Sequence, residues 1–183
     1  MKVEILEEAG FDSAMFGLSL SKQQSVWRIQ EVSHKLYSKD FGHNKFLEHI
    51  EVWLKVTAPR FWWQEADTYR LCSKQSDSTM HTIHKALLTQ ENFEYPIFPT
   101  TLAKLNMAIA AYGADKSVEN LLTVKNNLPE GFLSTREWKM SYKELRNIIS
   151  QRITHRLPQW LYFCQEIQKQ IKHPEYFSDL FKE

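Results

Sequence analysis

The sequence predicts an α/β or α+β domain with few strands and several helices. Residues Glu48–Thr57 alternate between apolar and polar or bulky side chains, which indicates a half-buried strand, and Phe132–Ser141 has similar strand character. Apolar residues spaced by three and four positions at Ser25–Ser38 and Thr101–Tyr112 predict amphipathic helices. With 43% hydrophobic and 13% aromatic residues, the 183-residue chain can build the core of a single domain spanning residues 1–183.

The remaining elements follow from local signals along the chain. A short strand is expected at Val3–Leu6. Pro59 suits the first turn of a short helix that continues to about Asp67, because its missing N–H costs nothing there. Ser117 is a predicted N-cap for a helix that ends near Lys125. Two more helices are expected at Ser141–Ile153 and Gln159–Ile171.

Composition excludes several classes of partner. The 23 basic and 22 acidic residues give a net charge of +1, so the chain has no bulk attraction to a nucleic-acid polymer. Charged residues interrupt the apolar runs well before the roughly 20 residues that cross a bilayer. Cys72 and Cys164 lie far apart and fit a reducing compartment, with Cys72 expected as a packed thiol. We therefore expect a cytoplasmic protein that does not bind membranes.

Common catalytic motifs are absent. The sequence has no G-x-G-x-x-G, no P-loop and no G-x-S-x-G, which disfavours dinucleotide, phosphotransfer and hydrolase folds of those types. His81 and His84 are spaced as two ligands on one helical face, but no third ligand lies near them in the sequence, so no metal site is predicted. The polar, hydroxyl-rich segment Thr68–Met80 is a better candidate for a ligand-lining strand or loop.

Two ordered blocks of residues resemble the flavin-dependent thymidylate synthases, the ThyX family. Gly42-His43 and Glu48-His49, then Ala58-Pro59 and Arg70-x7-Ser78, are similar to the family pattern G-H-x-x-x-x-E-H, strand, A-P, R-H-R-x7-S, without a gap. A second block resembles the region L-P…N-x-R-x-L-x-N-F-x-x-x-R…A-Q-W-E, with about one residue inserted before Gln159. Its matching positions are Leu128-Pro129, Asn147, Arg152 and Gln159-Trp160.

The resemblance implies a ThyX-like fold, namely a small, curved, mostly antiparallel sheet flanked by helices, with a C-terminal helical part. It also implies a homotetramer whose active sites lie between subunits. FAD would be the cofactor, and a pyrimidine nucleotide monophosphate such as dUMP would stack on its ring. Methylenetetrahydrofolate would give a one-carbon unit to C5 of the pyrimidine, NADPH would reduce the flavin, and the product would carry a methyl or a hydroxymethyl group.

Four residues are implied as nucleotide-binding or catalytic groups. Arg70 occupies the last Arg of the triplet and Ser78 the motif Ser, so the resemblance assigns both to catalysis and to nucleotide binding. Arg152 and Lys125 match two further basic positions for the nucleotide. Each residue has a structural alternative. Arg70 could form a surface ion pair, Ser78 could be a turn or cap hydroxyl, and Arg152 and Lys125 could be solvated helix charges.

Four others are implied as cofactor contacts. His43, Glu48 and Asn147 would border the flavin, and Tyr69 would offer a stacking surface. Satisfied polar groups at a strand end or an exposed helix Asn are the alternatives.

The departures from the family pattern predict weaker binding of the flavin phosphates. Each lost charge-assisted hydrogen bond costs roughly 1.5–3 kcal/mol. Residues that differ from the pattern are Thr68, Tyr69, Ser76, Met80, Ser141 and Lys143, and possible substitutes for the lost charge are Arg60, Lys74 and Arg156. The second hypothesis is therefore a catalytically inactive ThyX-like oligomeric scaffold that uses Phe61-Trp62-Trp63 as an interface, although core packing is expected for both Trp.

Overall fold

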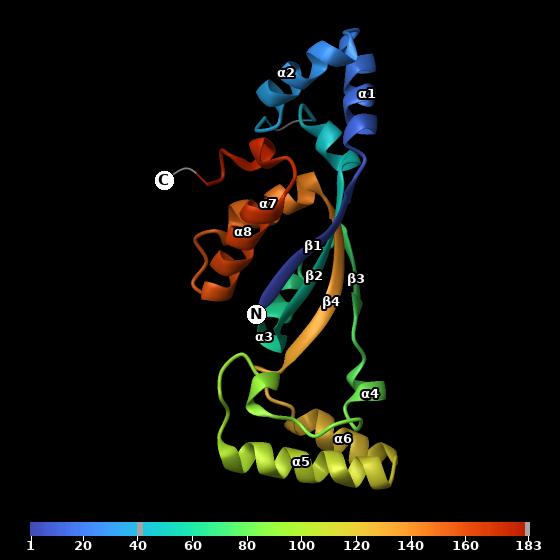
Figure 1. Cartoon of the computed structure of the whole chain (residues 1–183), viewed down its shortest axis with the longest axis vertical. Coiled ribbons are helices and arrows are strands. Elements are labelled where there is room, and N and C mark those ends of the chain that lie inside the picture. Colours follow the sequence, from blue (N-terminus) through green and yellow to red (C-terminus); the bar gives the residue numbers. More distant parts are fainter. Residues whose placement is uncertain (40–41, 182–183) are drawn as a thin grey trace. The chain divides into compact units, whose positions relative to one another are not determined.

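The computed structural model describes residues 1–39 and 42–181. Its sheet has four strands in the order β1 (Lys2–Ala9), β2 (Glu51–Pro59), β4 (Leu133–Ser141) and β3 (Cys72–Ser76) (Figure 1). β2 and β4 are antiparallel, because Tyr142 N–H donates to Ile50 O at one end of the pair and Arg60 N–H donates to Phe132 O at the other. The apolar face predicted for β2 is fully buried.

Helices make up most of the remaining chain. The α-helices are α1 (Phe11–Lys22), α2 (Val26–Leu36), α3 (Arg60–Ala66), α4 (Thr79–Thr82), α5 (Pro99–Ala114), α6 (Val118–Asn127), α7 (Tyr142–Arg152) and α8 (Pro158–Gln170). Three short 3₁₀ helices are η1 (Lys45–His49), η2 (Gln90–Asn92) and η3 (Pro174–Phe177).

The chain forms two compact units. Unit 1 comprises residues 1–2, 57–68 and 75–136, and unit 2 comprises residues 3–56, 69–74 and 137–183. All four strands contribute residues to both units, and one further boundary, between Thr68 and Tyr69, lies in the segment that connects α3 to β3.

Unit 2 is organised around the pair of helices α7 and α8, which lie against its strands (Figure 1). Phe163 of α8 packs on Trp138 of β4 with ring centroids 5.8 Å apart. Gln170 at the end of α8 bonds the β1 backbone twice, accepting from Ile5 N–H at 2.9 Å and donating to Val3 O at 3.0 Å. These contacts hold α8 on the sheet. Helix α7 begins directly after β4, where Ser141 caps it by accepting from Glu144 N–H at 3.2 Å.

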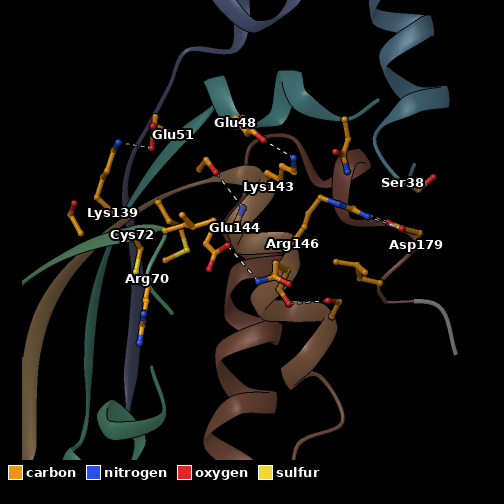
Figure 2. Close-up of a pocket in the computed structure, with 18 residues that line it drawn as sticks. Ser38, Glu48, Glu51, Arg70, Cys72, Lys139, Lys143, Glu144, Arg146 and Asp179 are labelled. Atoms are coloured by element: carbon orange, nitrogen blue, oxygen red, sulfur yellow. Dashed lines mark hydrogen bonds and ion pairs between the residues drawn. The ribbon is translucent and has the colours of Figure 1, made fainter. Parts of the chain in front are cut away.

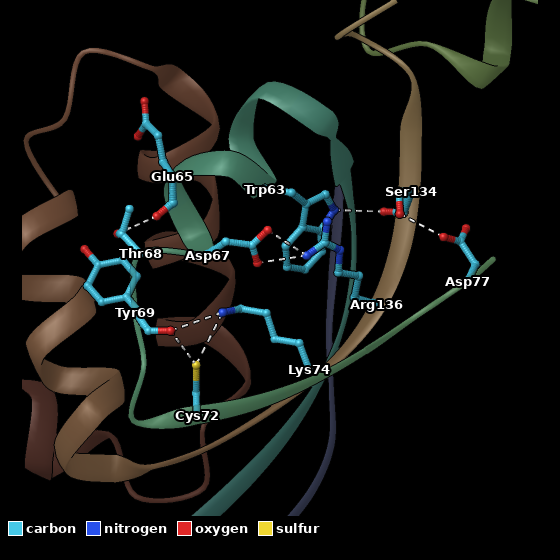
Figure 3. A network of polar contacts seen from close by, with 10 residues as sticks. All are labelled: Trp63, Glu65, Asp67, Thr68, Tyr69, Cys72, Lys74, Asp77, Ser134 and Arg136. Atoms are coloured by element: carbon cyan, nitrogen blue, oxygen red, sulfur yellow. Dashed lines mark hydrogen bonds and ion pairs between the residues drawn. The ribbon is translucent and has the colours of Figure 1, made fainter. Parts of the chain in front are cut away.

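Unit 1 has its own apolar core between α5, α6 and the segment that follows α4. Trp62 and Trp63 of α3 are 0% and 1% exposed. Trp63 donates to Ser134 O at 3.1 Å, and the Arg136 guanidinium, paired with Asp67, lies 4.3 Å from its ring centroid (Figure 3). The two indoles are therefore core residues, as expected from the sequence, and cannot form the aromatic interface of the scaffold hypothesis.

Most predicted elements are confirmed within a few residues, including the Ser117 N-cap, which accepts from Asn120 N–H. Helix α1 was not predicted. Its exposed Phe16 and Leu20, together with Gly17, give it no clear apolar stripe. Two predicted boundaries are wrong: Glu48 belongs to η1 rather than to the strand, and Pro59 is the N-cap residue of α3 rather than its first helical residue.

Candidate functional site

A large pocket opens in unit 2, and we call it the main pocket (Figure 2). Its volume is about 1070 Å³. Its walls come from η1, the segment around Arg70, the end of β4, the first turns of α7 and the C-terminal segment near Asp179. The junction of β4 and α7 supplies much of the wall. Because α7 begins where β4 ends, polar residues at the end of the strand and in the first turns of the helix face the same pocket.

Three predicted site residues line the main pocket together. Arg70, Glu48 and Asn147 come from three separate segments of the chain. Ser141 and Lys143, two positions where the sequence departs from the family pattern, line it as well. Residues from both sequence blocks therefore line one pocket.

The charges on the wall of the main pocket are mostly paired. Lys139 bonds Glu51 at 2.7 Å, Lys143 bonds Glu48 at 2.5 Å, and Arg146 makes two parallel bonds of 2.8 Å to Asp179. The remaining cation, Arg70, is exposed and forms no ion pair within residues 1–39 and 42–181. Its side chain extends away from the three pairs (Figure 2). Arg70 is thus the one cation of the wall without an ion pair among the described residues.

The backbone ahead of Arg70 is held by side chains of β3. The carbonyl of Tyr69 accepts hydrogen bonds from Cys72 Sγ at 3.1 Å and from Lys74 Nζ at 3.3 Å (Figure 3). Lys74 also lies 5.0 Å from the Trp138 ring centroid. Lys74 and Cys72 therefore orient the turn that carries Arg70, which explains Cys72 as a structural thiol. Burial raises the pKa of the other thiol, Cys164, to about 12.

Glu144 is the buried carboxyl group of the main pocket. It is 7% exposed, and burial raises its pKa above the ordinary value. A hydrogen bond from Asn147 Nδ2 at 3.4 Å and the positive charge of Lys74 act in the opposite direction. Sequence reasoning missed this residue, although the spacing Ser141-x-x-Glu144 marks it as a helix-start residue.

Tyr69 and Arg152 contact each other outside the wall of the main pocket. Arg152 Nε donates to Tyr69 Oη at 2.7 Å, and its guanidinium lies 4.7 Å from the ring centroid of Trp160. Tyr69 is 8% exposed and also donates to Gln151. The Tyr69 side chain is therefore buried and hydrogen-bonded within the fold. Arg152 belongs to the same unit as Arg70 but does not line the main pocket.

Ser78 and Lys125 belong to unit 1. Ser78 precedes α4, and its carbonyl accepts from His81 N–H and from Thr82 Oγ1. Lys125 of α6 donates to Thr79 Oγ1. The two residues thus flank the same short helix. Arg60, a proposed substitute charge, donates to Leu128 O at 2.8 Å in this unit.

His43 lines a second, smaller pocket of unit 2, which we call the basic pocket. It measures about 270 Å³ and lies between α1 and η1. Its basic side chains are Lys22, His43, Lys45 and His49, and no Asp or Glu of the described chain lines it. None of these four forms an ion pair within the described ranges.

Other kinds of site find no support in the part of the chain that the structure describes. No group of three or more His, Cys, Asp or Glu side chains there is placed to hold a metal ion. His81 is exposed, and His84 packs edge-on against Tyr112. No helix among the described residues combines the length and the apolar character that crossing a membrane requires.

Comparison with solved structures identifies the fold. No protein-family model and no curated protein matches the sequence. Two crystal structures of the flavin-dependent thymidylate synthase ThyX from Helicobacter pylori, both with FAD and dUMP, superpose on the chain with a TM-score of 0.78. Each comparison covers 100% of both chains at 17% sequence identity. The likeness confirms the predicted α+β fold with a ThyX-like architecture.

Proposed function

We propose that this chain is a flavin-dependent thymidylate synthase-like enzyme of the cytoplasm. It would transfer a one-carbon unit from methylenetetrahydrofolate to C5 of a pyrimidine nucleotide monophosphate, converting dUMP to dTMP or a related pyrimidine to its methyl or hydroxymethyl product. One observation carries the proposal: Arg70, Glu48 and Asn147, which the resemblance to the ThyX motifs implies as site residues, line one large pocket in a fold shared with ThyX enzymes.

The main pocket fits an anionic, largely planar cofactor such as FAD. Its volume of about 1070 Å³ exceeds the needs of a small metabolite. Arg70 offers an uncompensated guanidinium to a phosphate or a ring carbonyl, and Asn147 offers an amide to the ring edge. FAD bound there would supply the electron-transfer chemistry, with NADPH as its reductant, while these residues hold and orient it.

Four predicted residues would hold the nucleotide, namely Arg70, Ser78, Arg152 and Lys125. Ser78 and Lys125 flank α4 and would contact the pyrimidine nucleotide, with Ser78 beside the base. Arg152 would contribute through the Tyr69 and Trp160 rings that hold its guanidinium. Its engagement with those rings argues for a fixed orientation rather than a mobile side chain.

A homotetramer with active sites between subunits would complete the site. His43, a proposed flavin contact, lines the basic pocket rather than the main pocket of its own chain. A second copy could bring its His43 to the main pocket of the first. The proposal therefore predicts that the active protein is a homotetramer. Light scattering measures the molar mass that tests this prediction.

A product assay tests the proposed function. Purified protein is incubated with FAD, NADPH, methylenetetrahydrofolate and dUMP, and the nucleotide is analysed by mass spectrometry. We expect the nucleotide to gain the mass of a CH2 group for a methyl product or of CH2O for a hydroxymethyl product. We also expect a yellow protein with flavin absorbance. A colourless protein that binds neither added FAD nor dUMP would contradict the proposal and leave an inactive oligomeric relative.

A further inference from the structure

The carboxyl group of Glu144 has a position that its sequence context does not explain. The spacing Ser141-x-x-Glu144 is that of a capping box, in which the Glu side chain accepts from the N–H of the capping residue. Only half of that motif forms: Glu144 N–H donates to Ser141 Oγ at 3.2 Å, while the Glu144 carboxyl lies on the wall of the main pocket (Figure 2). The side chain is therefore not needed to cap α7.

The same carboxyl group is nearly without partners. Among the described residues, its one hydrogen bond comes from Asn147 Nδ2 at 3.4 Å, close to the limit for such a bond. Its charged and titratable surroundings are Lys74 and Cys72 on β3, Arg70 before β3, and the three ion pairs of the wall defined above. Three of the wall's cations already bind other carboxylates, and Lys74 is held at the Tyr69 carbonyl.

The same wall holds a buried polar atom that has no hydrogen-bond partner among the described residues. Asn44 lines the main pocket and is 7% exposed, and its Oδ1 atom has no hydrogen-bond partner in the described chain. Its Nδ2 donates to Tyr37 O at 3.3 Å. A buried polar atom left unpaired costs about 1–3 kcal/mol, so such atoms usually have a ligand or a water as partner. A carboxyl group with one long hydrogen bond and an unpaired amide oxygen therefore lie in one wall, and the polar edge of a ring could pair with such groups.

We propose that Glu144, in its acid form, binds the imide edge of a heterocycle in the main pocket through two hydrogen bonds. Its O–H would donate to the ring carbonyl oxygen, and its C=O would accept from the ring N–H. The inference rests on the proposed function, because the uracil base and the flavin ring both carry this edge. Neither role for Glu144 follows from the family motif.

The protonated Glu144 side chain, its ionised form and its substitutes differ in the hydrogen bonds that they can make. An ionised carboxylate loses the donor and repels the ring carbonyl oxygen, so binding weakens as Glu144 loses its proton. Glu144→Gln keeps one donor and one acceptor in nearly the same shape and cannot ionise. Glu144→Ala removes both.

The test measures FAD binding by flavin fluorescence and dUMP binding by calorimetry, on the full chain, from pH 4.5, the ordinary pKa of the carboxyl group, upward to about pH 8. Wild type, Glu144→Gln and Glu144→Ala are compared with a control, Glu137→Gln, which alters an exposed glutamate of β4 outside the main pocket. We expect wild-type affinity for one ligand to fall about tenfold across this range, as one good hydrogen bond is lost. Glu144→Gln should show a flatter profile, Glu144→Ala should bind weakly throughout, and the control should match wild type.

The outcomes separate the inference from the proposed function. The ligand that shows the profile identifies the ring, flavin or pyrimidine, that Glu144 contacts. Equal affinity in wild type and Glu144→Ala, or equal loss in Glu144→Gln and Glu144→Ala, overturns the inference and leaves the proposed function standing. Failure of wild type to bind either ligand overturns both. Should Glu144→Ala not fold, the profile of wild type against Glu144→Gln decides alone.

Discussion

The two pockets of unit 2 treat charge in opposite ways. Four acidic and four basic residues line the main pocket, and three of its cations are matched to carboxylates at 2.5–2.8 Å. Four basic residues and no acidic one line the basic pocket. Paired charges stabilise a wall, whereas the two lysines of the basic pocket gain no such stabilisation from an ion pair.

The comparison also separates structural from binding groups within the main pocket. Arg146 is 9% exposed and is fully engaged by Asp179 and by the Tyr176 carbonyl, so it holds the C-terminal segment on α7. Arg70 and Glu144 line the same space without an ion pair among the described residues. Three ion pairs therefore stabilise the walls of the main pocket, and one cation and one carboxyl group of its lining have no ion pair among the described residues.

The largest effect on stability is expected from breaking the pair between Arg146 and Asp179. Asp179→Ala leaves a nearly buried guanidinium without its carboxylate, which costs about 3 kcal/mol in the free energy of unfolding. Urea denaturation measures the change. Glu4→Ala, which removes the exposed partner of Lys55 at 3.8 Å, is the control and should cost less than about 0.5 kcal/mol. Equal effects in the two variants would show that the main pocket is not held by its ion pairs.

A smaller, pH-dependent effect is expected at Glu144. Burial raises the pKa of this carboxyl group in the folded state above its ordinary value of 4.5. Its favourable contribution is fully present below the unfolded value and is lost as the pH rises through the folded value. The melting temperature of Glu144→Gln relative to wild type should therefore increase with pH over this window. A difference that stays constant with pH would mean that the folded chain does not resist ionisation of Glu144.

The smallest effect is expected in the basic pocket. Lys22→Ala combined with Lys45→Ala removes two unpaired charges, so the free energy of unfolding should change by less than about 0.5 kcal/mol. Any gain at low salt should vanish near 1 M salt, where repulsion is screened. Lys104→Ala with Lys116→Ala, two exposed positions of unit 1, matches the charge change. A clear loss in the first variant alone would reveal a structural role for the basic pocket.

Much of the fold follows from short-range patterns. The alternation in β2 and the serine caps at Ser117 and Ser141 depend on neighbouring residues, so the sequence shows them directly. Helix α1 escaped prediction because it is stabilised by its contacts with α2 and η1 rather than by an apolar stripe of its own.

The candidate site could be predicted only at residues that match a family motif in the sequence. The resemblance to the ThyX motifs pointed to Arg70, Glu48 and Asn147, and the folded chain brings these three to one pocket. It could not show that Arg152 lies on Tyr69 and Trp160, because that contact joins residues far apart in the chain and depends on the packing of α7 and α8. For the same reason the long-range ion pairs of the main pocket became visible only in the folded chain.

Flavin binding by an arginine variant is the most direct measurement of the central claim that Arg70 is the anion-binding group of the main pocket. FAD is titrated by fluorescence into wild type, Arg70→Ala and the control Arg28→Ala, an exposed arginine of α2 outside both pockets. Loss of one charge-assisted hydrogen bond should weaken FAD binding by about tenfold or more in Arg70→Ala, with the control unchanged. Undiminished FAD binding by a folded Arg70→Ala protein would contradict the account.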